Sequence, residues 1–236
     1  MANSILVLGN SGSGKTSSLL PIPEVDIKGL KPEETFIINV AKKPLPVRGF
    51  KKFYKEFDRQ TKKGNLLNSS VPSEIVNYIN NIPKLGTIKN VIIDDANYLL
   101  TGEYMARAKE TGFNKFVDIG KNFFDVITAG INLPSDMNFI MFAHTEIEDG
   151  AYKIKTVGKM IDSQINPIGY FTYCLVSSAY VDSEGKTQYG FFTNATRDDR
   201  NIVVPAKSPV GVFKDLIIPN DMGYVIDEIE KYNQGE

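Results

Sequence analysis

The sequence of 236 residues predicts an α/β protein of three layers, in which helices cover both faces of a largely parallel sheet. Three observations favour this class. Apolar runs of strand length recur along the chain, segments with helical apolar spacing lie between several of them, and a glycine-rich turn follows the first run. The chain shows no internal repeat or low-complexity tract. We therefore expect a single domain over residues 1–236.

The first predicted strand is Ser4–Leu8, and the turn behind it matches the phosphate-binding pattern G-x-x-x-x-G-K-[ST] at every fixed position. Glycines in such a turn let backbone N–H groups face phosphate oxygens, and the helix that follows adds the positive end of its dipole. The lysine reaches the β- and γ-phosphates, and the threonine hydroxyl ligates Mg²⁺. A glycine-rich loop of purely structural purpose is the alternative. The predicted nucleotide-binding residues are Gly9, Asn10, Ser11, Gly12, Ser13, Gly14, Lys15, Thr16 and Ser17.

The next elements are a short helix and a buried strand. The helix after the turn ends near Leu20, because Pro21 and Pro23 follow. The run Thr35–Val40 is too short for a helix and is apolar throughout most of its length, which indicates a buried strand. Farther along, Ser73 is expected to cap a helix that continues to about Ile82.

A basic segment, Lys42–Lys63, lies between the strand Thr35–Val40 and the helix expected after Ser73. It holds nine basic residues against two acidic ones, about +7, although the whole chain carries a formal charge of −1. Four aromatic residues within it, Phe50, Phe53, Tyr54 and Phe57, have the spacing of an amphipathic helix. The aromatic residues either pack on the domain beneath solvated lysines, or the surface contacts nucleic acid, with single-stranded DNA favoured. A protein partner is a third possibility.

A second strand of chemical interest is Asn90–Asp94, three apolar residues closing on an acid as in the Walker B pattern. A parallel strand of this kind delivers its carboxylate beside the phosphate loop, where Asp94 would hold Mg²⁺ through water. Asp95 is the candidate that polarises the attacking water. The alternative is that these aspartates only cap the strand end.

The following elements are a helix over Lys115–Gly130 and a buried strand over Asn138–Thr145. The strand ends in His144, the single histidine, and in Thr145. Either residue is placed to sense the γ-phosphate, and an ordinary structural histidine is the alternative. Residues 146–167 are polar without a convincing period. We expect loops at 146–166 and 177–190 that switch when the γ-phosphate leaves.

The C-terminal part predicts a strand over Tyr170–Val176, a hairpin built from residues 180–182 and 188–192, and a final helix over Val225–Tyr232. Cys174 lies within the first of these strands, and as the single cysteine it is expected to be a buried small hydrophobe. No apolar run approaches the length of a membrane span, and no signal-type segment opens the chain, so a cytoplasmic location is expected.

In the order of four features, the chain resembles compact phage-encoded ATPases of the RecA/AAA type. These features are the phosphate loop, the strand closing on Asp94 and Asp95, the inner strand ending at His144, and the hairpin followed by Arg197 and Arg200. The resemblance implies a RecA-like core, ATP on Gly9–Thr16 and Mg²⁺ held by Thr16 and Asp94. It also implies that His144 is the sensor and that Arg197 or Arg200 reaches the γ-phosphate of a neighbouring subunit.

The chain departs from that family at two places. RecA-like motors commonly place two basic residues two apart after such a hairpin, whereas Arg197 and Arg200 are three apart with two aspartates between them. A surface ion pair between Arg200 and Asp198 is the alternative. RecA places its catalytic glutamate after an earlier strand, where this chain has Asn39-Val40-Ala41, and the catalytic role therefore falls on Asp95.

The predicted function is an ATPase that acts on DNA in phage recombination or replication, as a homo-oligomer with ATP between subunits. The predicted catalytic residues are Lys15, Asp95, His144, Arg197 and Arg200. Two other functions stay open: a nucleotide-gated loading module with little turnover, and a small-molecule kinase that uses the same phosphate loop.

Overall fold

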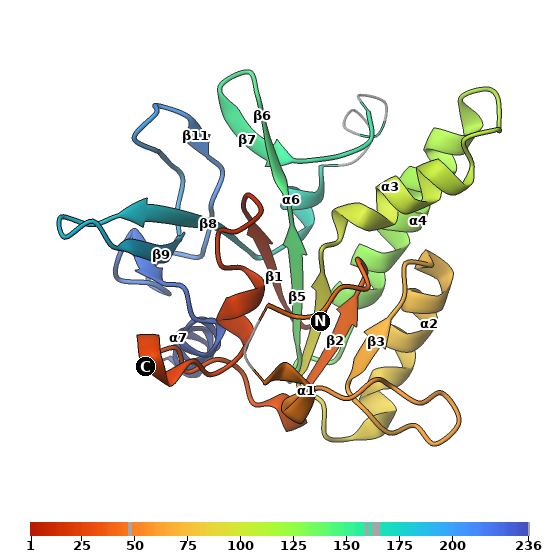
Figure 1. The fold of residues 1–236 in the computed structure, drawn as a ribbon, viewed down its shortest axis with the longest axis horizontal. Coiled ribbons are helices and arrows are strands. Elements are labelled where there is room, and N and C mark those ends of the chain that lie inside the picture. The colour runs from red at the N-terminus through yellow and green to blue at the C-terminus, as the bar shows by residue number, and fades with distance from the viewer. Residues whose placement is uncertain (47–48, 159–160, 162–165, 236) are drawn as a thin grey trace.

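The computed structural model describes residues 1–46, 49–158, 161 and 166–235, and its centre is an eight-stranded sheet in the order β12-β9-β8-β1-β5-β4-β2-β3 (Figure 1). Neighbouring strands from β8 to β3 run parallel, and β9 and β12 join antiparallel at one edge. This confirms the predicted largely parallel sheet with a hairpin in the C-terminal part. The strands are β1 (Asn3–Leu8), β2 (Thr35–Asn39), β3 (Leu66–Asn68), β4 (Asn90–Asp94), β5 (Asn138–Ala143), β8 (Tyr173–Val181), β9 (Thr187–Phe192) and β12 (Ile217–Pro219).

Helices cover both faces of the sheet and complete the three layers (Figure 1). Alternate residues of β1 point to opposite faces, so Leu6 and Leu8 join one apolar cluster with α2, α3 and α4, whereas Ile5 and Val7 join another with η1 and α7. The helices are α1 (Phe50–Phe53), α2 (Pro72–Asn81), α3 (Asn97–Ala106), α4 (Asn114–Ile131), α6 (Pro167–Tyr170) and α7 (Met222–Gln234), with short 3₁₀ helices η1 (Thr16–Leu19), η2 (Pro23–Val25), η3 (Pro32–Glu34) and η4 (Ile82–Leu85).

The helix predicted through the aromatic residues of the basic segment is wrong beyond its first turn. α1 ends at Phe53, and Tyr54 has an extended backbone. The reason lies in the pairing partner: the N–H of Phe57 donates to Leu66 O at 2.8 Å, and the N–H of Leu66 donates to Lys55 O at 2.9 Å. Tyr54 and Phe57 are thereby buried, and Phe53 is exposed. Arg48 of this segment lies outside the described residues.

The helix expected after a cap at Ser73 begins at Pro72, so its N-cap residue is Val71, two residues earlier than expected. Proline suits the first turn of a helix because its fixed φ is already helical and no N–H is lost from the hydrogen-bond ladder. The cap expected at Ser73 is therefore wrong, although the helix itself is confirmed.

The polar stretch after β5 is the second element that differs from expectation. Instead of a loop, it forms a hairpin of β6 (Thr145–Glu148) and β7 (Ala151–Ile154). Asp149 and Gly150 both have positive φ, 51° and 73°, as a tight two-residue hairpin turn requires. The hairpin joins β10 (Thr196–Arg197) and β11 (Val203–Val204) in a small second sheet. Lys159, within the expected switch loop, lies outside the described residues.

Within the described ranges, none of the helices is both long enough and apolar enough to cross a membrane.

Candidate functional site

The glycine-rich loop connects β1 to η1 at the carboxyl end of the sheet, and its backbone needs glycine at two positions. Gly12 and Gly14 have φ of 81° and 90°, in the left-handed region. A side chain on Gly14 would also collide with the amide of Asn220 and the ring of Tyr189, whose nearest atoms lie 2.9 and 3.1 Å from the position of a Cβ. The loop therefore has the backbone that its sequence pattern predicts.

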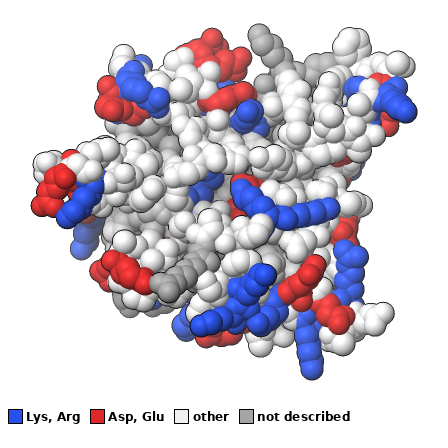
Figure 2. All heavy atoms as spheres, viewed as in Figure 1, with Lys and Arg blue, Asp and Glu red and all other residues white. Residues whose placement is uncertain are grey.

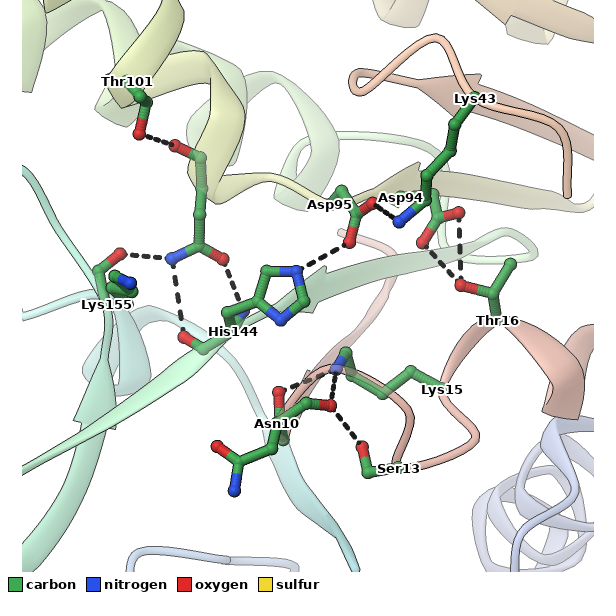
Figure 3. A network of polar contacts seen from close by, with 12 residues as sticks. Asn10, Ser13, Lys15, Thr16, Lys43, Asp94, Asp95, Thr101, His144 and Lys155 are labelled. Carbon is green, nitrogen blue, oxygen red and sulfur yellow. Dashed lines mark hydrogen bonds and ion pairs between the residues drawn. The ribbon is translucent and has the colours of Figure 1, made fainter. Parts of the chain in front are cut away.

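Lys15 is buried and folds back over its own loop (Figure 3). Its ammonium donates to Gly9 O at 2.7 Å and to Asn10 O at 2.8 Å. Burial lowers the pKa of Lys15 to about 8, and the nearby Asp95 and Asp94 partly offset that effect. The ammonium thus lies inside the loop that is expected to receive phosphate, held by two carbonyl groups.

Thr16 and Asp94 are in direct contact at the base of the loop, although 78 residues separate them. Thr16 Oγ1 donates to Asp94 Oδ1 at 3.0 Å. Asp94 is almost fully buried, and burial, reinforced by the charge of Asp95, raises its pKa to about 6. A hydroxyl and a carboxylate side by side fit the oxygen-ligand preference of Mg²⁺, which is commonly held by one or two carboxylates together with substrate phosphates.

Asp95 lies between two basic side chains (Figure 3). Its Oδ1 is 3.1 Å from His144 Nε2, and its Oδ2 is 2.5 Å from Lys43 Nζ. Burial alone would raise the pKa of Asp95, but the hydrogen bonds from His144 and Lys43 outweigh it and lower that pKa to about 2. Asp95 also has a φ of 62°, a left-handed backbone conformation that is uncommon for residues other than glycine.

His144 is held in position by the start of α3. Its N–H donates to the side chain of Asn97, and the Asn97 amide is 3.4 Å from His144 O. The neighbouring Thr145 donates to Asn10 Oδ1 at 2.9 Å, which links the end of β5 to the glycine-rich loop. Of the two residues predicted as alternative sensors, His144 therefore contacts the carboxylate of Asp95, and Thr145 contacts the glycine-rich loop.

Two polar residues that the sequence did not single out hold the loop from its other side. The hydroxyl of Ser177 in β8 donates to Ser13 O, and Asn220 Nδ2 lies 3.3 Å from the same oxygen. Lys43, Asn97, Ser177 and Asn220 were all missed as site residues. Only Lys43 carried a signal, as a member of the basic segment, and that signal suggested a different surface.

Arg197 and Arg200 are not brought to this site. Arg197 donates to Asn201 O at 2.8 Å, and Arg200 forms an ion pair with Asp198 at 3.1 Å and contacts the Tyr152 hydroxyl, on the second sheet. The ion pair between Arg200 and Asp198 is the alternative that the sequence left open.

The loop and Asp95 border a cavity of about 920 Å³. On one side are the loop residues from Ser11 to Ser17 with Lys43, Asp95 and His144, and on the other are residues of η2, the β8–β9 hairpin and β12, including Val25, Tyr189 and Ile218. This size falls within the range of small-molecule sites, and the lining combines few charged groups with apolar ones.

The three-layer sheet with a glycine-rich loop after β1 and an acid at the end of β4 defines a P-loop core of the α/β class. No protein-family model matches the chain, and no curated protein matches it. Among solved structures, the chain is similar to a KaiC-like protein from the hyperthermophilic archaeon Pyrococcus horikoshii, with 13% identity over 85% of this chain and 83% of that chain and a TM-score of 0.45. The fold assignment rests on the sheet and loop described above.

Proposed function

We propose that this protein binds ATP with Mg²⁺ and hydrolyses it. The observation that carries the proposal is the contact of Thr16 Oγ1 with Asp94 Oδ1 at 3.0 Å, where Thr16 and its neighbours in the glycine-rich loop line a cavity. A hydroxyl that ends a phosphate loop and an acid that ends a neighbouring strand are the pair expected to hold the metal of a nucleoside triphosphate.

In this proposal, each residue of the site has a separate task. Lys15 leaves the carbonyls of Gly9 and Asn10 and contacts the β- and γ-phosphates, while loop N–H groups from Gly12 to Ser17 donate to phosphate oxygens. Thr16 would hold Mg²⁺ directly and Asp94 would hold it through water, and the metal would supply positive charge that neutralises the phosphates. Asp95, kept ionised by its low pKa, orients the attacking water, and His144 positions Asp95.

We also propose single-stranded DNA as a partner, through the basic segment Lys42–Lys63. Lys51, Lys52 and Lys55 are exposed around α1, and Phe53 beside them is exposed at 47%. Figure 2 shows lysine and arginine side chains over this region, with acidic side chains close to them. Burial of Tyr54 and Phe57 supports packing for those two aromatic residues and leaves Phe53 as the ring available for stacking.

The role in phage recombination or replication rests on the resemblance of the motifs, and the assembly with ATP between subunits rests on it as well. For Arg197 or Arg200 to reach a neighbouring γ-phosphate, each would have to leave its present partner, Asn201 O or Asp198. Native mass measurement with and without a nonhydrolysable ATP analogue tests this part. A mass that stays at one chain in both conditions contradicts the shared site.

The nucleotide assignment is tested with Lys15→Ala, measured by calorimetric titration of a nonhydrolysable Mg²⁺–ATP analogue and by ATP turnover. We expect binding or turnover to be lost, because the variant removes the cation that contacts the phosphates. Lys84→Ala, on η4 and away from the cavity, is the control and should behave like the unaltered chain. Unchanged binding and turnover in Lys15→Ala would remove the assignment.

Turnover with and without single-stranded DNA separates the three candidate functions. Stimulation by DNA favours the DNA-coupled ATPase, and tight binding with negligible turnover favours the nucleotide-gated loading module. Transfer of phosphate to a metabolite, independent of DNA, favours a kinase.

A further inference from the structure

The charges around the cavity point to one more residue that contacts nucleotide. Of the lysines and arginines in the described part of the chain, two line this cavity, Lys15 of the loop and Lys43 after β2. A bound nucleoside triphosphate brings several negative charges into the site, and sites for such groups commonly supply more than one cation. Arg197 and Arg200, predicted to supply a second cation from a neighbouring subunit, are held elsewhere in this chain.

Lys43 enters the site from the side opposite the loop (Figure 3). Its backbone is fixed at the end of β2, where the amide of the buried Asn39 donates to Lys43 O at 2.7 Å and to Asn68 Oδ1 at 2.9 Å. The lysine stem is half-exposed, but its ammonium lies 2.5 Å from the buried carboxylate of Asp95. A flexible stem with an anchored base lets the ammonium change partners without moving the strand.

The position of Asp95 identifies the phosphate that Lys43 would meet. Asp95 directly follows Asp94, which would hold the metal of a bound triphosphate, and such a metal would supply positive charge to the terminal phosphates. The charge of Lys43 already acts on this region: together with burial, which is the larger effect, it lowers the pKa of Lys15. The two ammonium groups therefore face the same space from opposite sides.

We propose that Lys43 is a second triphosphate-binding residue, which exchanges Asp95 for the γ-phosphate when nucleotide enters the cavity. The exchange leaves Asp95 paired with His144 and gives the terminal phosphate a cation from within the same chain. This inference rests on the proposed nucleotide function and deepens it, because it distinguishes triphosphate from diphosphate.

The test is Lys43→Met, which removes the charge and keeps the length of the stem. Affinities for a nonhydrolysable Mg²⁺–ATP analogue and for Mg²⁺–ADP are measured by calorimetry. We expect the affinity for the analogue to fall about ten- to hundredfold, and the affinity for ADP to change by less than about threefold. The matched control is Lys89→Met, a lysine paired with Glu34 at the other end of β4, which should leave both affinities unchanged.

A second experiment, in the Asp95→Asn variant, tells whether Lys43 contacts phosphate or only neutralises the charge of Asp95. If Lys43 only masks the carboxylate, its removal should cost nothing in Asp95→Asn, where no carboxylate charge repels the nucleotide. We expect the loss of analogue affinity to persist in the double variant Lys43→Met/Asp95→Asn, measured against Asp95→Asn alone. Disappearance of that loss, or an equal loss of ADP affinity in Lys43→Met, would overturn the inference and leave the nucleotide function standing. Failure of the unaltered chain to bind either nucleotide would instead overturn the proposed function, and the inference with it.

Discussion

The ionised carboxylate of Asp94 suits metal binding but lowers the stability of the folded chain. Its carboxyl group is almost fully buried, and burial raises its pKa from 3.8 to about 6. A raised acid pKa means that the folded chain holds this proton more tightly than the unfolded chain does. The ionised carboxylate therefore costs stability, and the cost grows from about pH 4 to about pH 6 and stays constant above that.

The first prediction follows from this stability cost of ionised Asp94. Asp94→Asn, which keeps an oxygen for Thr16 and removes the charge, should raise the melting temperature of the nucleotide-free chain by a few degrees at pH 7.5 or so. The gain should shrink as the pH falls from about 6 to 4, because the native aspartate then becomes neutral in the folded chain. The same variant should lose Mg²⁺-dependent nucleotide affinity. A melting temperature that is lower than that of the unaltered chain at pH 7.5 would contradict the prediction.

At the residue scale, the sequence predicted the part of the site that is local in the chain. The loop from Gly9 to Thr16 is contiguous, and the acids follow a recognisable strand, so motif and period sufficed. The pair of Lys43 and Asp95 joins residues that follow different strands, and Asn97 supports His144 across 47 positions. Local spacing carries no information on such contacts, because they depend on which strands are neighbours.

At the scale of elements, the contact of α4 with β5 depends on a missing side chain. A Cβ on Gly130 would lie 2.3 Å from ring atoms of the buried Phe139, whereas a Cβ on Gly102 in α3 meets no atom within 4 Å outside its own helix backbone. The two glycines lie in helices that pack on each other and on the same face of the sheet. The effect of alanine on stability can therefore be compared between these two positions.

We predict opposite effects of alanine at these positions, measured as the free energy of unfolding in urea. Gly102→Ala should stabilise by about 0.5–1 kcal/mol, because the unfolded chain loses freedom and alanine favours the helix. Gly130→Ala should destabilise by about 1–3 kcal/mol, because Phe139 has to move within a packed core. Equal stabilisation by both variants would show that the ring adjusts without cost.

The sequence predicted most strands and the helices α2, α4 and α7, since their periods are long and clear. It missed the β6–β7 hairpin, where Asp149-Gly150 is a hairpin signal but the flanking strands are only four residues each. It extended α1 too far, because the aromatic spacing matched a helix while the backbone of residues 55–57 pairs with Leu66. Tertiary hydrogen bonding overrode the local pattern in that segment.

At the scale of the whole molecule, the distribution of charge carries a prediction on DNA. Although the net charge is −1, the exposed lysines around α1 form a local positive surface. Replacing Lys51, Lys52 and Lys55 by glutamine should weaken binding of single-stranded DNA and flatten the slope of log K against log salt by about 2. The control replaces Lys84, Lys89 and Lys231, which changes the net charge equally outside the segment. A slope that falls equally in both triple variants would assign the effect to net charge alone.

The order of the strands could not be predicted, because periodicity identifies a parallel strand and says nothing of its neighbours. In the structure β1 lies between β5 and β8, so the loop that follows β1 has a neighbour on each side. Thr145 contacts the loop after β5, and Ser177 contacts it from β8. The general rule that ligands bind at the carboxyl ends of parallel strands predicts a site at that edge, where the loop and Asp94 meet.

The burial of Cys174 makes it possible to attach a fluorescent label at one chosen position of this chain. It lies in β8 against Leu6 of β1, fully enclosed, and burial raises the pKa of its thiol to about 12. A thiol in that state hardly forms the thiolate that alkylating dyes require. Since the sequence holds no other cysteine, one introduced on the surface would take a maleimide fluorophore at a single known position, without first stripping a native thiol from the interior.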